Sequence, residues 1–592
     1  MARKLPETDV VLVGVGWTGG ILARELTRAN VRVVGLERGA PRVSREFAAP
    51  QMHDELRYAL RHELMQDLSR ETVTFRNDAR GVARPMRAYG SFLPGEGVGG
   101  AGVHWNGQSW RFLPYDFEMR TRTVARYGAK ALPPDSLVQD WGVTYEELEP
   151  YFDAFEYVCG VSGKAGNLKG RIQPGGNPFE GARGREFPTP PLKSTYASHL
   201  FAEAATSAGY HPFPRPSANL SEPYTNPDGQ QLGRCVYCGY CERFGCEMNA
   251  KSSPHITVIP AALATGRFEL RTHANVLRVN LDSPKRRAVS VTYVDLRTGE
   301  ELEQPASLVC LTSYTFNNVR LMLQSRIGQP YDPATGRGVV GRSYSYQSSA
   351  GASLFFDDKV FNTFMGTGSV GIAIDDFNGD NFDHSGLGFL HGGAISVGNS
   401  GARPIAYHPT PPGTPRWGSA WKREAAKYYN RSFGIGAQNA CLSYRQNYLD
   451  LDPQYTDSFG QPLLRMTFDW GVNERAASDY LAGVCERLAK SLNPSHMVAG
   501  GLSRRGGGAS RYNIVPYQTT HNCGGAIMGA DRATSAVNRY LQSWDVANLF
   551  VVGASAFPQN GGYNPTGTVG ALAYWSANAL VDRYLKKPGA LV

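Results

Sequence analysis

The sequence contains no long hydrophobic run. No apolar stretch approaches the ~18–20 residues that a helix needs to cross a bilayer, so the chain itself is not predicted to span a membrane. The first residues are basic and an apolar segment follows, but Glu7 and Asp9 interrupt the pattern. No small-residue cleavage site comes after it, so the sequence predicts no export signal of its own.

Concentrated charge and repetition are also missing. The net charge is +9 and 19% of the residues are charged, yet there is no long Lys/Arg block with interleaved aromatics. Nucleic acid is therefore not an expected partner, and a mildly basic surface suits acidic partners or substrates. With no repeats or low-complexity tails, 42% hydrophobic residues and 592 residues in all, the composition indicates a globular protein of two or more domains.

Cysteine is scarce, but it is concentrated in one place. Of nine cysteines, four fall within twelve residues: Cys235, Cys238, Cys241 and Cys246. Free cysteines usually occur singly as small hydrophobic residues, whereas thiolates at successive two-residue gaps can converge on one centre, as in iron–sulfur loops. Zinc sites more often use two short Cys pairs separated by a longer stretch. The spacing favours an iron–sulfur cluster, with zinc or a redox disulfide as the alternatives.

A glycine motif near the start of the chain predicts a dinucleotide site. Residues 9–14 (DVVLVG) are typical of a buried parallel strand, and Gly14, Gly16 and Gly19 follow in the spacing G-x-G-x-x-G before a helical stretch. These glycines permit a tight turn, the approach of a pyrophosphate and close helix–strand packing, respectively. Glu37 ends the second strand, where an acid accepts hydrogen bonds from ribose hydroxyls and disfavours a 2′-phosphate. NAD or FAD is therefore expected.

Two later segments extend this pattern. Residues 95–112 (GEGVGGAGVHWNGQSWRF) form a glycine-dense loop, which by composition alone could be a simple surface loop. Residues 548–558 (NLFVVGASAFP) are typical of a strand that delivers small residues to a ligand, and NPTGT begins a helix at Asn564. The N-terminus of that helix would also point at the cofactor.

Over nearly its whole length the sequence resembles the glucose–methanol–choline (GMC) oxidoreductases, and within them the flavoprotein subunits of gluconate 2-dehydrogenases. The resemblance is carried by DVVLVGVGWTGG, GVGGAGVHWNG, DWGVTYEELEPYFD, the four-cysteine segment, FNNVRLMLQSRIG, NYLDLDP, HNCGGAIMG and NPTGT. It implies an α/β fold (α+β overall) with a Rossmann-like FAD-binding domain, an antiparallel-sheet substrate domain and an iron–sulfur insertion. We expect the FAD domain at 1–200, 257–345 and 505–592, the cysteine segment at 201–256 and the substrate domain at 346–504.

The resemblance also implies the residues that bind FAD. The expected set is Gly14, Gly16, Trp17, Thr18, Gly19 and Glu37 at the adenosine diphosphate, Gly97, Gly99, Gly100, Gly102 and Asn106 beside the isoalloxazine, Val276 at the adenine, and Gly553, Ala554, Asn564 and Thr566 from the C-terminal part. Related flavoproteins attach the flavin through a His in this loop, so His104 is a candidate covalent link, with a noncovalent flavin neighbour as the alternative. Many family members carry an acid where this chain has Gly553, so a backbone N–H or another group must serve there.

In this superfamily a base removes the hydroxyl proton of an alcohol while a hydride passes to the flavin. On the family motif, His521 is the base and Asn564 the second catalytic residue. A neutral imidazole suits this role because its unperturbed pKa is near 6.5. Cys523 is expected to be a packing residue rather than a nucleophile. The favoured reaction is oxidation of gluconate at its second carbon; the alternatives are sorbitol, glucose, a glucoside or 2-keto-gluconate, an oxygen-using oxidase, or a zinc-stabilised flavin-binding module.

The resemblance further implies an outlet for electrons. Related enzymes carry a three-iron–four-sulfur cluster in the cysteine segment, which needs three of its four thiolates and would pass electrons singly to a multihaem cytochrome c subunit. A signal-bearing, small chaperone-like subunit would carry the folded chain to the periplasmic face of the cytoplasmic membrane, with membrane attachment only through partners. The sequence does not identify the residues that bind the substrate carboxylate: several arginines between residues 400 and 512 are candidates, and no motif distinguishes one of them.

Overall fold

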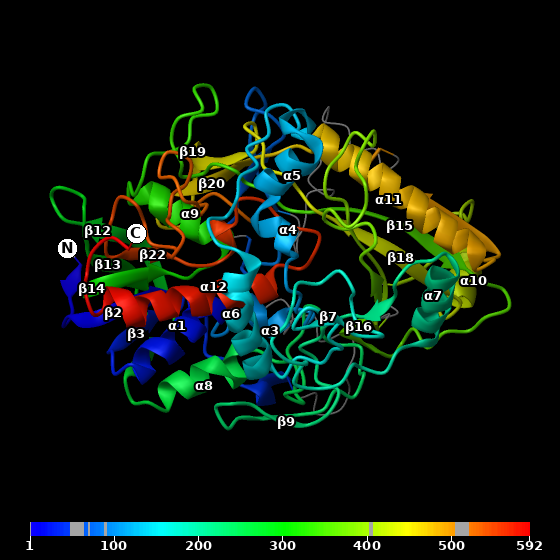
Figure 1. Cartoon of the computed structure of the whole chain (residues 1–592). Coiled ribbons are helices and arrows are strands. Elements are labelled where there is room, and N and C mark those ends of the chain that lie inside the picture. Colours follow the sequence, from blue (N-terminus) through cyan, green and yellow to red (C-terminus); the bar gives the residue numbers. More distant parts are fainter. Residues whose placement is uncertain are drawn as a thin grey trace.

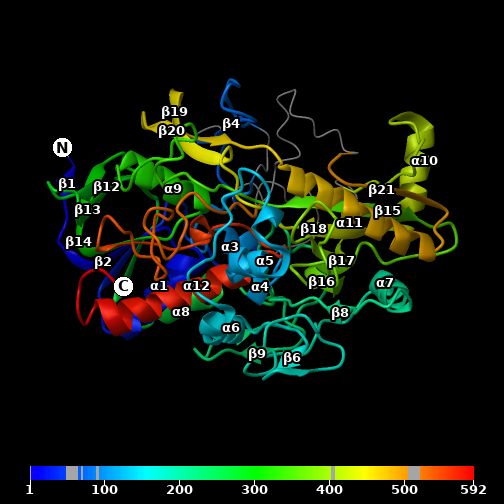
Figure 2. The same cartoon turned by 45° about the horizontal axis from the view of Figure 1, so that its top comes forward.

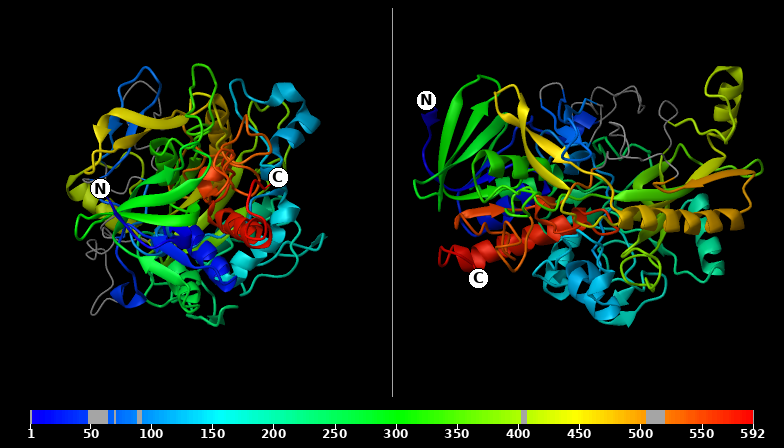
Figure 3. Two further views of the ribbon diagram at one scale, coloured as in Figure 1. Left: turned by 90° about the vertical axis from the view of Figure 1, so that its left-hand side faces the viewer. Right: turned by 90° about the horizontal axis from the view of Figure 1, so that it is seen from above.

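The computed structural model describes residues 2–47, 64–68, 71–87, 92–401, 407–503 and 520–591. Two β-sheets lie toward opposite ends of the molecule, and helices pack against each of them (Figure 1 and Figure 3). The α/β fold class predicted from the sequence is confirmed. No helix of the described residues is long and apolar enough to cross a membrane.

The first sheet joins segments from the beginning, middle and end of the chain. Its central strands are parallel because each is buried on both faces and connected through helices. In order, the strands are β11 (Phe268–Arg271), β3 (Val33–Leu36), β2 (Thr8–Val13), β14 (Glu301–Leu311), β13 (Ala288–Asp295) and β12 (Ala274–Leu281), with β1 (Arg3–Lys4) and β22 (Leu549–Val551) also paired to β14. The antiparallel strands β13 and β12 continue one edge.

Helices from distant parts of the chain cover this sheet. Directly after β2 comes α1 (Trp17–Arg28), which packs against both α8 (Val258–Leu263) and α12 (Thr566–Ala579). In turn, α12 packs against α6 (Tyr145–Cys159). The N-termini of α1 and α12 are consequently brought to the same end of the sheet, the carboxyl end of β2.

The second sheet is antiparallel, and two helices cover one of its faces. Its order is β21 (His496–Gly500), β15 (Ser348–Phe355), β18 (Ser432–Asn439), β17 (Gly393–Ser400), β16 (Gly366–Ile374) and β8 (Phe213–Pro214). Helix α11 (Val472–Ser491) lies along β15 and β18 (Figure 2), and α7 (Tyr196–Ser207) packs on β16 and β17. Alternate residues of β18, namely Phe433, Ile435 and Ala437, belong to the core beneath these helices, so Gln438 points from the other face.

Strand pairing departs from the predicted segments in two places. Strand β8 comes from the region 201–256, yet it pairs with β16 of the second sheet. Residues of QPLLRMTFDW form β20 (Pro462–Thr467), which joins a separate sheet with β19 (Tyr448–Thr456), β4 (Thr74–Arg76) and β5 (Arg84–Pro85). Strand β20 belongs to the segment 346–504, where an antiparallel-sheet domain is expected, yet it pairs with β19 and β4 and not with a strand of the second sheet.

The remaining described elements are short or peripheral. They are α3 (Ala101–His104), α4 (Pro114–Phe117), α5 (Met119–Tyr127), α9 (Thr315–Gln324), α10 (Gly418–Tyr428), the two-residue pairs β6 (Asn167–Leu168) with β7 (Arg171–Ile172) and β9 (Tyr224–Thr225) with β10 (Gln231–Leu232), and single turns at Ser44–Phe47, Ala129–Ala131, Pro254–Ile256, Ala554–Ala556 and Leu580–Tyr584.

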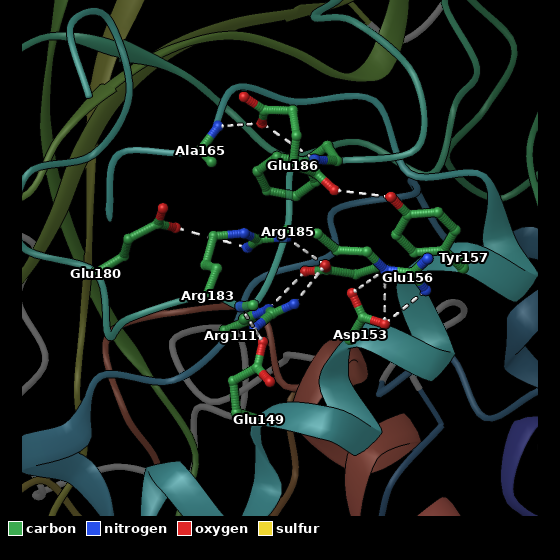
Figure 4. Close-up of polar contacts among 12 residues, drawn as sticks. Arg111, Glu149, Asp153, Glu156, Tyr157, Ala165, Glu180, Arg183, Arg185 and Glu186 are labelled. Atoms are coloured by element: carbon green, nitrogen blue, oxygen red, sulfur yellow. Dashed lines mark hydrogen bonds and ion pairs between the residues drawn. The ribbon is translucent and has the colours of Figure 1, made fainter. Parts of the chain in front are cut away.

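A buried ion cluster fixes the end of the glycine-dense loop to α6. Arg111 donates to Glu156 through two nitrogens, at 2.9 and 2.7 Å, and Arg183 bonds the same carboxylate from the other side (Figure 4). Glu149 and Glu180 complete what we call the ion cluster. Burial raises the pKa of Glu156, but the two guanidinium groups outweigh it and hold that pKa below its ordinary value. The carboxylate is therefore ionised in the interior of the protein.

Candidate active site

A cavity of about 460 Å³ lies where the carboxyl ends of β2, β3, β14 and β22 meet the N-termini of α1 and α12. Such a position is the usual ligand site of a parallel α/β sheet. The predicted residues that line it are Gly14, Gly16, Trp17, Thr18, Glu37, Gly100, Gly102, His104, Asn106, Val276, His521, Gly553, Ala554, Asn564 and Thr566. Gly19, Gly97 and Gly99 are not among the lining residues.

The glycines of the first motif have different structural duties. Gly14 has φ +95°, and a Cβ there would lie 2.7 Å from Ser313 Oγ. A Cβ on Gly19 would lie 2.1 Å from the carbonyl oxygen of Gly14, so Gly19 is required by the packing of the turn itself. A Cβ on Gly16 would meet nothing closer than 3.7 Å, because this residue faces the cavity. Gly16 thus leaves space for a ligand, whereas the other two allow the turn to form.

Glu37 is occupied by the protein's own backbone. Its Oε2 accepts a hydrogen bond from the Val15 N–H at 3.0 Å, and its Oε1 accepts one from the Gly39 N–H at 2.9 Å. Burial raises the pKa of Glu37, while these two N–H groups oppose the rise. Glu37 therefore holds the glycine turn in place. Each of its carboxylate oxygens keeps a lone pair, so the contact of Glu37 with the ribose of the cofactor stays a prediction.

Two polar atoms at the cavity fit a flavin dinucleotide. Among the described residues, Trp17 Nε1 and His104 Nε2 are buried without a hydrogen-bond partner. Burial, and to a lesser extent the Lys251 ammonium, lowers the pKa of His104 to about 3, so its imidazole is neutral. A neutral ring nitrogen without a hydrogen-bond partner is suited to contact with FAD. So is the space beside Gly16 at the N-terminus of α1. Gly553 lines the cavity with φ +136° and offers only its backbone.

The two predicted catalytic residues meet at one end of this cavity. His521 Nε2 lies 3.0 Å from Asn564 Nδ2, although the residues are 43 positions apart in the chain. Asn564 precedes α12, and the His521 segment is held by a two-way backbone pairing of Cys523 with Ser345 and by Asn560, which donates to the His521 carbonyl at 2.9 Å. Burial lowers the pKa of His521 to about 4, so the imidazole is neutral over the ordinary range of pH.

Two glutamines that sequence reasoning missed contact this pair. Gln347 Oε1 lies 2.5 Å from His521 Nδ1, and Gln438 Nε2 donates to Asn564 Oδ1 at 3.2 Å. Gln347 directly precedes β15, and Gln438 lies in β18, the neighbouring strand of the second sheet. We call Gln347, His521, Asn564 and Gln438 the catalytic amide chain. The glutamines lie in no motif, so no sequence signal distinguishes them from the other glutamines.

Cys523 is a buried thiol beside the catalytic pair. Its sulfur donates to the His521 carbonyl at 3.5 Å, and burial raises its pKa well above the ordinary value. The thiol is accordingly protonated, which suits packing rather than nucleophilic attack.

The four clustered cysteines are near one another but do not form a metal site. Cys235 and Cys241 are buried, whereas Cys238 is exposed; the Cys241 thiol bonds to the Thr367 hydroxyl at 3.4 Å and to Asn219 Oδ1 at 3.5 Å. Burial raises the pKa of Cys235 to about 12 and that of Cys238 to about 11, which favours neutral thiols. Among the described residues, which include all four, no group of three or more His, Cys, Asp or Glu side chains could hold a metal ion. The observed arrangement does not fit a preformed iron–sulfur centre.

A buried lysine joins the cysteine segment to the cavity. The Lys251 ammonium donates to the carbonyls of Trp105, Cys241 and Phe244 at 2.8, 2.7 and 2.7 Å. The backbone N–H of Arg243 donates to the His104 carbonyl at 2.7 Å. The cysteine segment is therefore in direct contact with the loop that carries His104. Of the arginines considered for the substrate carboxylate, Arg403, Arg504, Arg505 and Arg511 lie outside the described residues.

Comparison with known proteins shows the family of this chain. Residues 139–343 and 443–573 each match the GMC oxidoreductase family. The chain is 50% identical over its whole length to the gluconate 2-dehydrogenase flavoprotein of Pantoea cypripedii, of which it covers 96%. It is 26% identical to the 2-methyl-1,2-propanediol dehydrogenase of Mycolicibacterium austroafricanum and 24% identical to the fructose dehydrogenase large subunit of Gluconobacter japonicus, covering 97% and 99% of them.

A solved structure shares the fold. The pyridoxine 4-oxidase from Mesorbium loti superimposes with a TM-score of 0.56 at 16% identity, and the match covers 97% of this chain and 99% of the other. The two family matches and the 50% identity to a flavoprotein define a flavin-dependent oxidoreductase. The chain belongs to the GMC oxidoreductase family, and it is an FAD-dependent dehydrogenase of that family.

Proposed function

We propose that this dehydrogenase oxidises a sugar acid, with gluconate oxidised at its second carbon as the favoured substrate. The observation that carries the chemistry is the neutral His521, whose Nε2 and neighbouring Asn564 amide face the cavity together. The substrate assignment is supported by the 50% identity to a protein named for gluconate.

In the proposed reaction His521 Nε2 accepts the hydroxyl proton of the substrate. The Asn564 amide holds the same hydroxyl and limits its motion, so that the proton leaves along the line to the imidazole. FAD, when bound, supplies the hydride acceptor. Gly14, Gly16, Trp17, Thr18 and Glu37 would hold its diphosphate and ribose, with Gly19 supporting the turn. Val276 would lie at the adenine, and Gly100, Gly102, Asn106, Gly553, Ala554 and Thr566, which line the cavity, would lie along the ring system. Gly97 and Gly99, which do not line the cavity, would support the loop.

The substrate is tested by anaerobic titration of the purified protein. Gluconate should bleach the visible flavin band, while glucose, sorbitol, a glucoside and 2-keto-gluconate should act more slowly or not at all. Bleaching by one of those compounds and not by gluconate would refute the substrate assignment while leaving the chemistry intact. Rapid oxygen consumption during turnover would instead favour an oxidase.

His104 is proposed as the attachment point of a covalently bound flavin. Its unpartnered, neutral Nε2 at the cavity supports this assignment. After denaturation and precipitation, flavin fluorescence should stay with the wild-type protein and be lost from His104→Ala. Release of the flavin from the wild-type protein would establish noncovalent binding.

The electron outlet is proposed from the cysteine spacing and from the contact between the cysteine segment and the His104 loop. A three-iron–four-sulfur cluster would occupy three of Cys235, Cys238, Cys241 and Cys246 only if the thiols rearranged from their observed positions. Iron and acid-labile sulfide should accompany the purified protein and vanish when Cys235, Cys238, Cys241 and Cys246 are all replaced by Ala. Zinc in place of iron, or neither metal, would overturn this proposal without affecting flavin reduction.

The same proposal includes partner subunits and a location. A small chaperone-like subunit and a multihaem cytochrome c subunit would place the enzyme at the periplasmic face of the membrane. The name of one relative, a large subunit, supports assembly with other chains. Affinity purification of the tagged chain from its own cells should recover a haem-containing partner in the membrane fraction. Recovery of the chain alone from the cytosol would contradict this assignment.

A further inference from the structure

The orientation of the Gln347 side-chain amide follows from its surroundings. Its amide nitrogen lies 2.5 Å from the carbonyl oxygen of Gly561 and 2.7 Å from that of Tyr563. Carbonyl oxygens can only accept hydrogen bonds, so the NH₂ group must face these two atoms. The amide oxygen of Gln347 must then face His521 Nδ1, which lies 2.5 Å away.

This orientation determines where the imidazole carries its proton. An amide oxygen only accepts, so Nδ1 of His521 must donate. In a neutral imidazole the other nitrogen, Nε2, is then unprotonated, and its lone pair can accept a hydrogen bond. Asn564 agrees with this assignment: its Oδ1 accepts from Gln438, and its Nδ2 donates toward His521 Nε2 at 3.0 Å. Every hydrogen bond of the catalytic amide chain consequently runs in the same direction.

The placement of Gln347 is built into the second sheet. Ser349 is paired with Gln438 in the register of β15 and β18, and side chains two residues apart on a strand share a face. Gln347 and Gln438 therefore project from the same face, the one opposite the core that contains Ala350 and Ala352. The second sheet in this way orients two groups contributed by the C-terminal segment.

We propose that Gln347 is a positioning residue that holds His521 in the Nδ1–H tautomer, so that the unprotonated Nε2 is presented to the substrate hydroxyl. The inference rests on the proposed role of His521 as the base. A carboxylate in this position would stabilise the charged imidazolium. A neutral amide instead fixes the tautomer without stabilising the charged form. Another histidine of this chain has a carboxylate as its partner: His391 Nε2 lies 2.6 Å from a carboxylate oxygen of Asp116 in a buried pair.

Three titratable neighbours of His521 among the described residues are neutral near pH 7. Burial is the cause of the low pKa of His521. Tyr314 and Tyr344 are hydrogen-bonded to segment 520–523, Cys523 lies within it, and burial raises the pKa of each. All three are neutral near pH 7, so a carboxylate introduced at position 347 would place a negative charge directly beside His521 Nδ1.

The test compares Gln347→Glu and Gln347→Met with the wild-type holoenzyme, using kcat/KM for the substrate that reduces its flavin across a range of pH. Gln347→Met should lower kcat/KM about 10- to 100-fold, because the ring loses its fixed orientation. Gln347→Glu should move the acid limb of the profile upward by about one pH unit or more, since the carboxylate stabilises the imidazolium. An unmoved acid limb in Gln347→Glu would overturn the proposal.

A matched control is Gln304→Met in the first sheet. Gln304 is also buried and donates to two backbone carbonyls, those of Pro6 and Pro305 at 2.7 and 2.9 Å, far from the catalytic pair in the fold. Its loss should reduce stability without altering the pH profile. If the Gln347 variants behave like Gln304→Met, the role of Gln347 is only structural.

A readout without turnover separates this inference from the proposed function. In protein labelled with ¹⁵N-histidine, the His521 signals, assigned by their loss in His521→Asn, should show a protonated Nδ1 and an unprotonated Nε2 at neutral pH. The opposite tautomer would refute the inference even if the enzyme oxidises gluconate. Undiminished activity of His521→Ala would refute the proposed base instead.

Discussion

Two buried polar clusters of this protein use opposite chemistry. The ion cluster around Glu156 is charged, and Arg111 holds the carboxylate through two nitrogens (Figure 4). The catalytic amide chain around His521 contains an imidazole and three amides, none of which is charged at neutral pH. Charges in fixed pairs anchor a loop but cannot easily exchange a proton. A neutral base among amides can accept a proton from the substrate.

The largest expected difference between the clusters is in catalysis. His521→Ala should lower the rate of flavin reduction about 10²–10⁴-fold, because a positioned general base contributes this much. The flavin spectrum and the melting temperature should stay near those of the wild-type protein. Stopped-flow absorbance with the preferred substrate measures the rate, and a loss below threefold would mean that another residue takes the proton.

Stability should respond in the opposite way. Glu156→Gln removes the carboxylate that two buried guanidinium groups share and should lower the free energy of unfolding by about 3–5 kcal/mol. Asp153 lies on the same helix and pairs with Arg185, whose side chain is 54% exposed. Asp153→Asn should therefore cost only about 0–1 kcal/mol. Denaturant unfolding compares the two, and equal losses would contradict the assigned role of the ion cluster.

The pH dependence of stability sharpens the comparison further. Burial raises the pKa of Asp375 to about 7, whereas the pKa of Glu156 is lowered. A raised carboxyl pKa means that the folded protein binds the proton more tightly, so this contribution to stability is lost as the pH rises from about 4 to about 7. Asp375→Asn should reduce that decline, measured by thermal unfolding across this range. Glu156 acts in reverse, because its contribution is lost as the pH falls below the unfolded value.

The sequence identified local features well because each depends on a short stretch of chain. The turn at Gly14 and Gly19 requires residues without a Cβ, and that requirement is visible as spacing. His521 and Asn564 could be named from family motifs. Gln347 and Gln438 could not, because their contacts arise only when strands 174 and 126 residues away in the chain reach the catalytic pair. A hydrogen bond of this kind leaves no periodic pattern.

The cysteine segment shows the converse. Its spacing indicates a metal centre, yet the thiols bond to neighbours such as Thr367 and Asn219, and no metal-holding group is present among the described residues. Spacing brings thiols within reach of one another but does not orient them, since orientation depends on the surrounding side chains.

By itself, the sequence determined the α/β class, the glycine turn after β2 and the membership of the GMC family, because each follows from short motifs. It also predicted His521 and Asn564 as a catalytic pair, and the structure brings these two residues together. Tertiary structure alone decided that Glu37 is bonded to the backbone of Val15 and Gly39 and that β20 joins the sheet of β19, β4 and β5 and not the second sheet. It also decided that two glutamines contact His521 and Asn564. These features arise from contacts between distant segments, and the geometry of such contacts is set only when the whole chain packs.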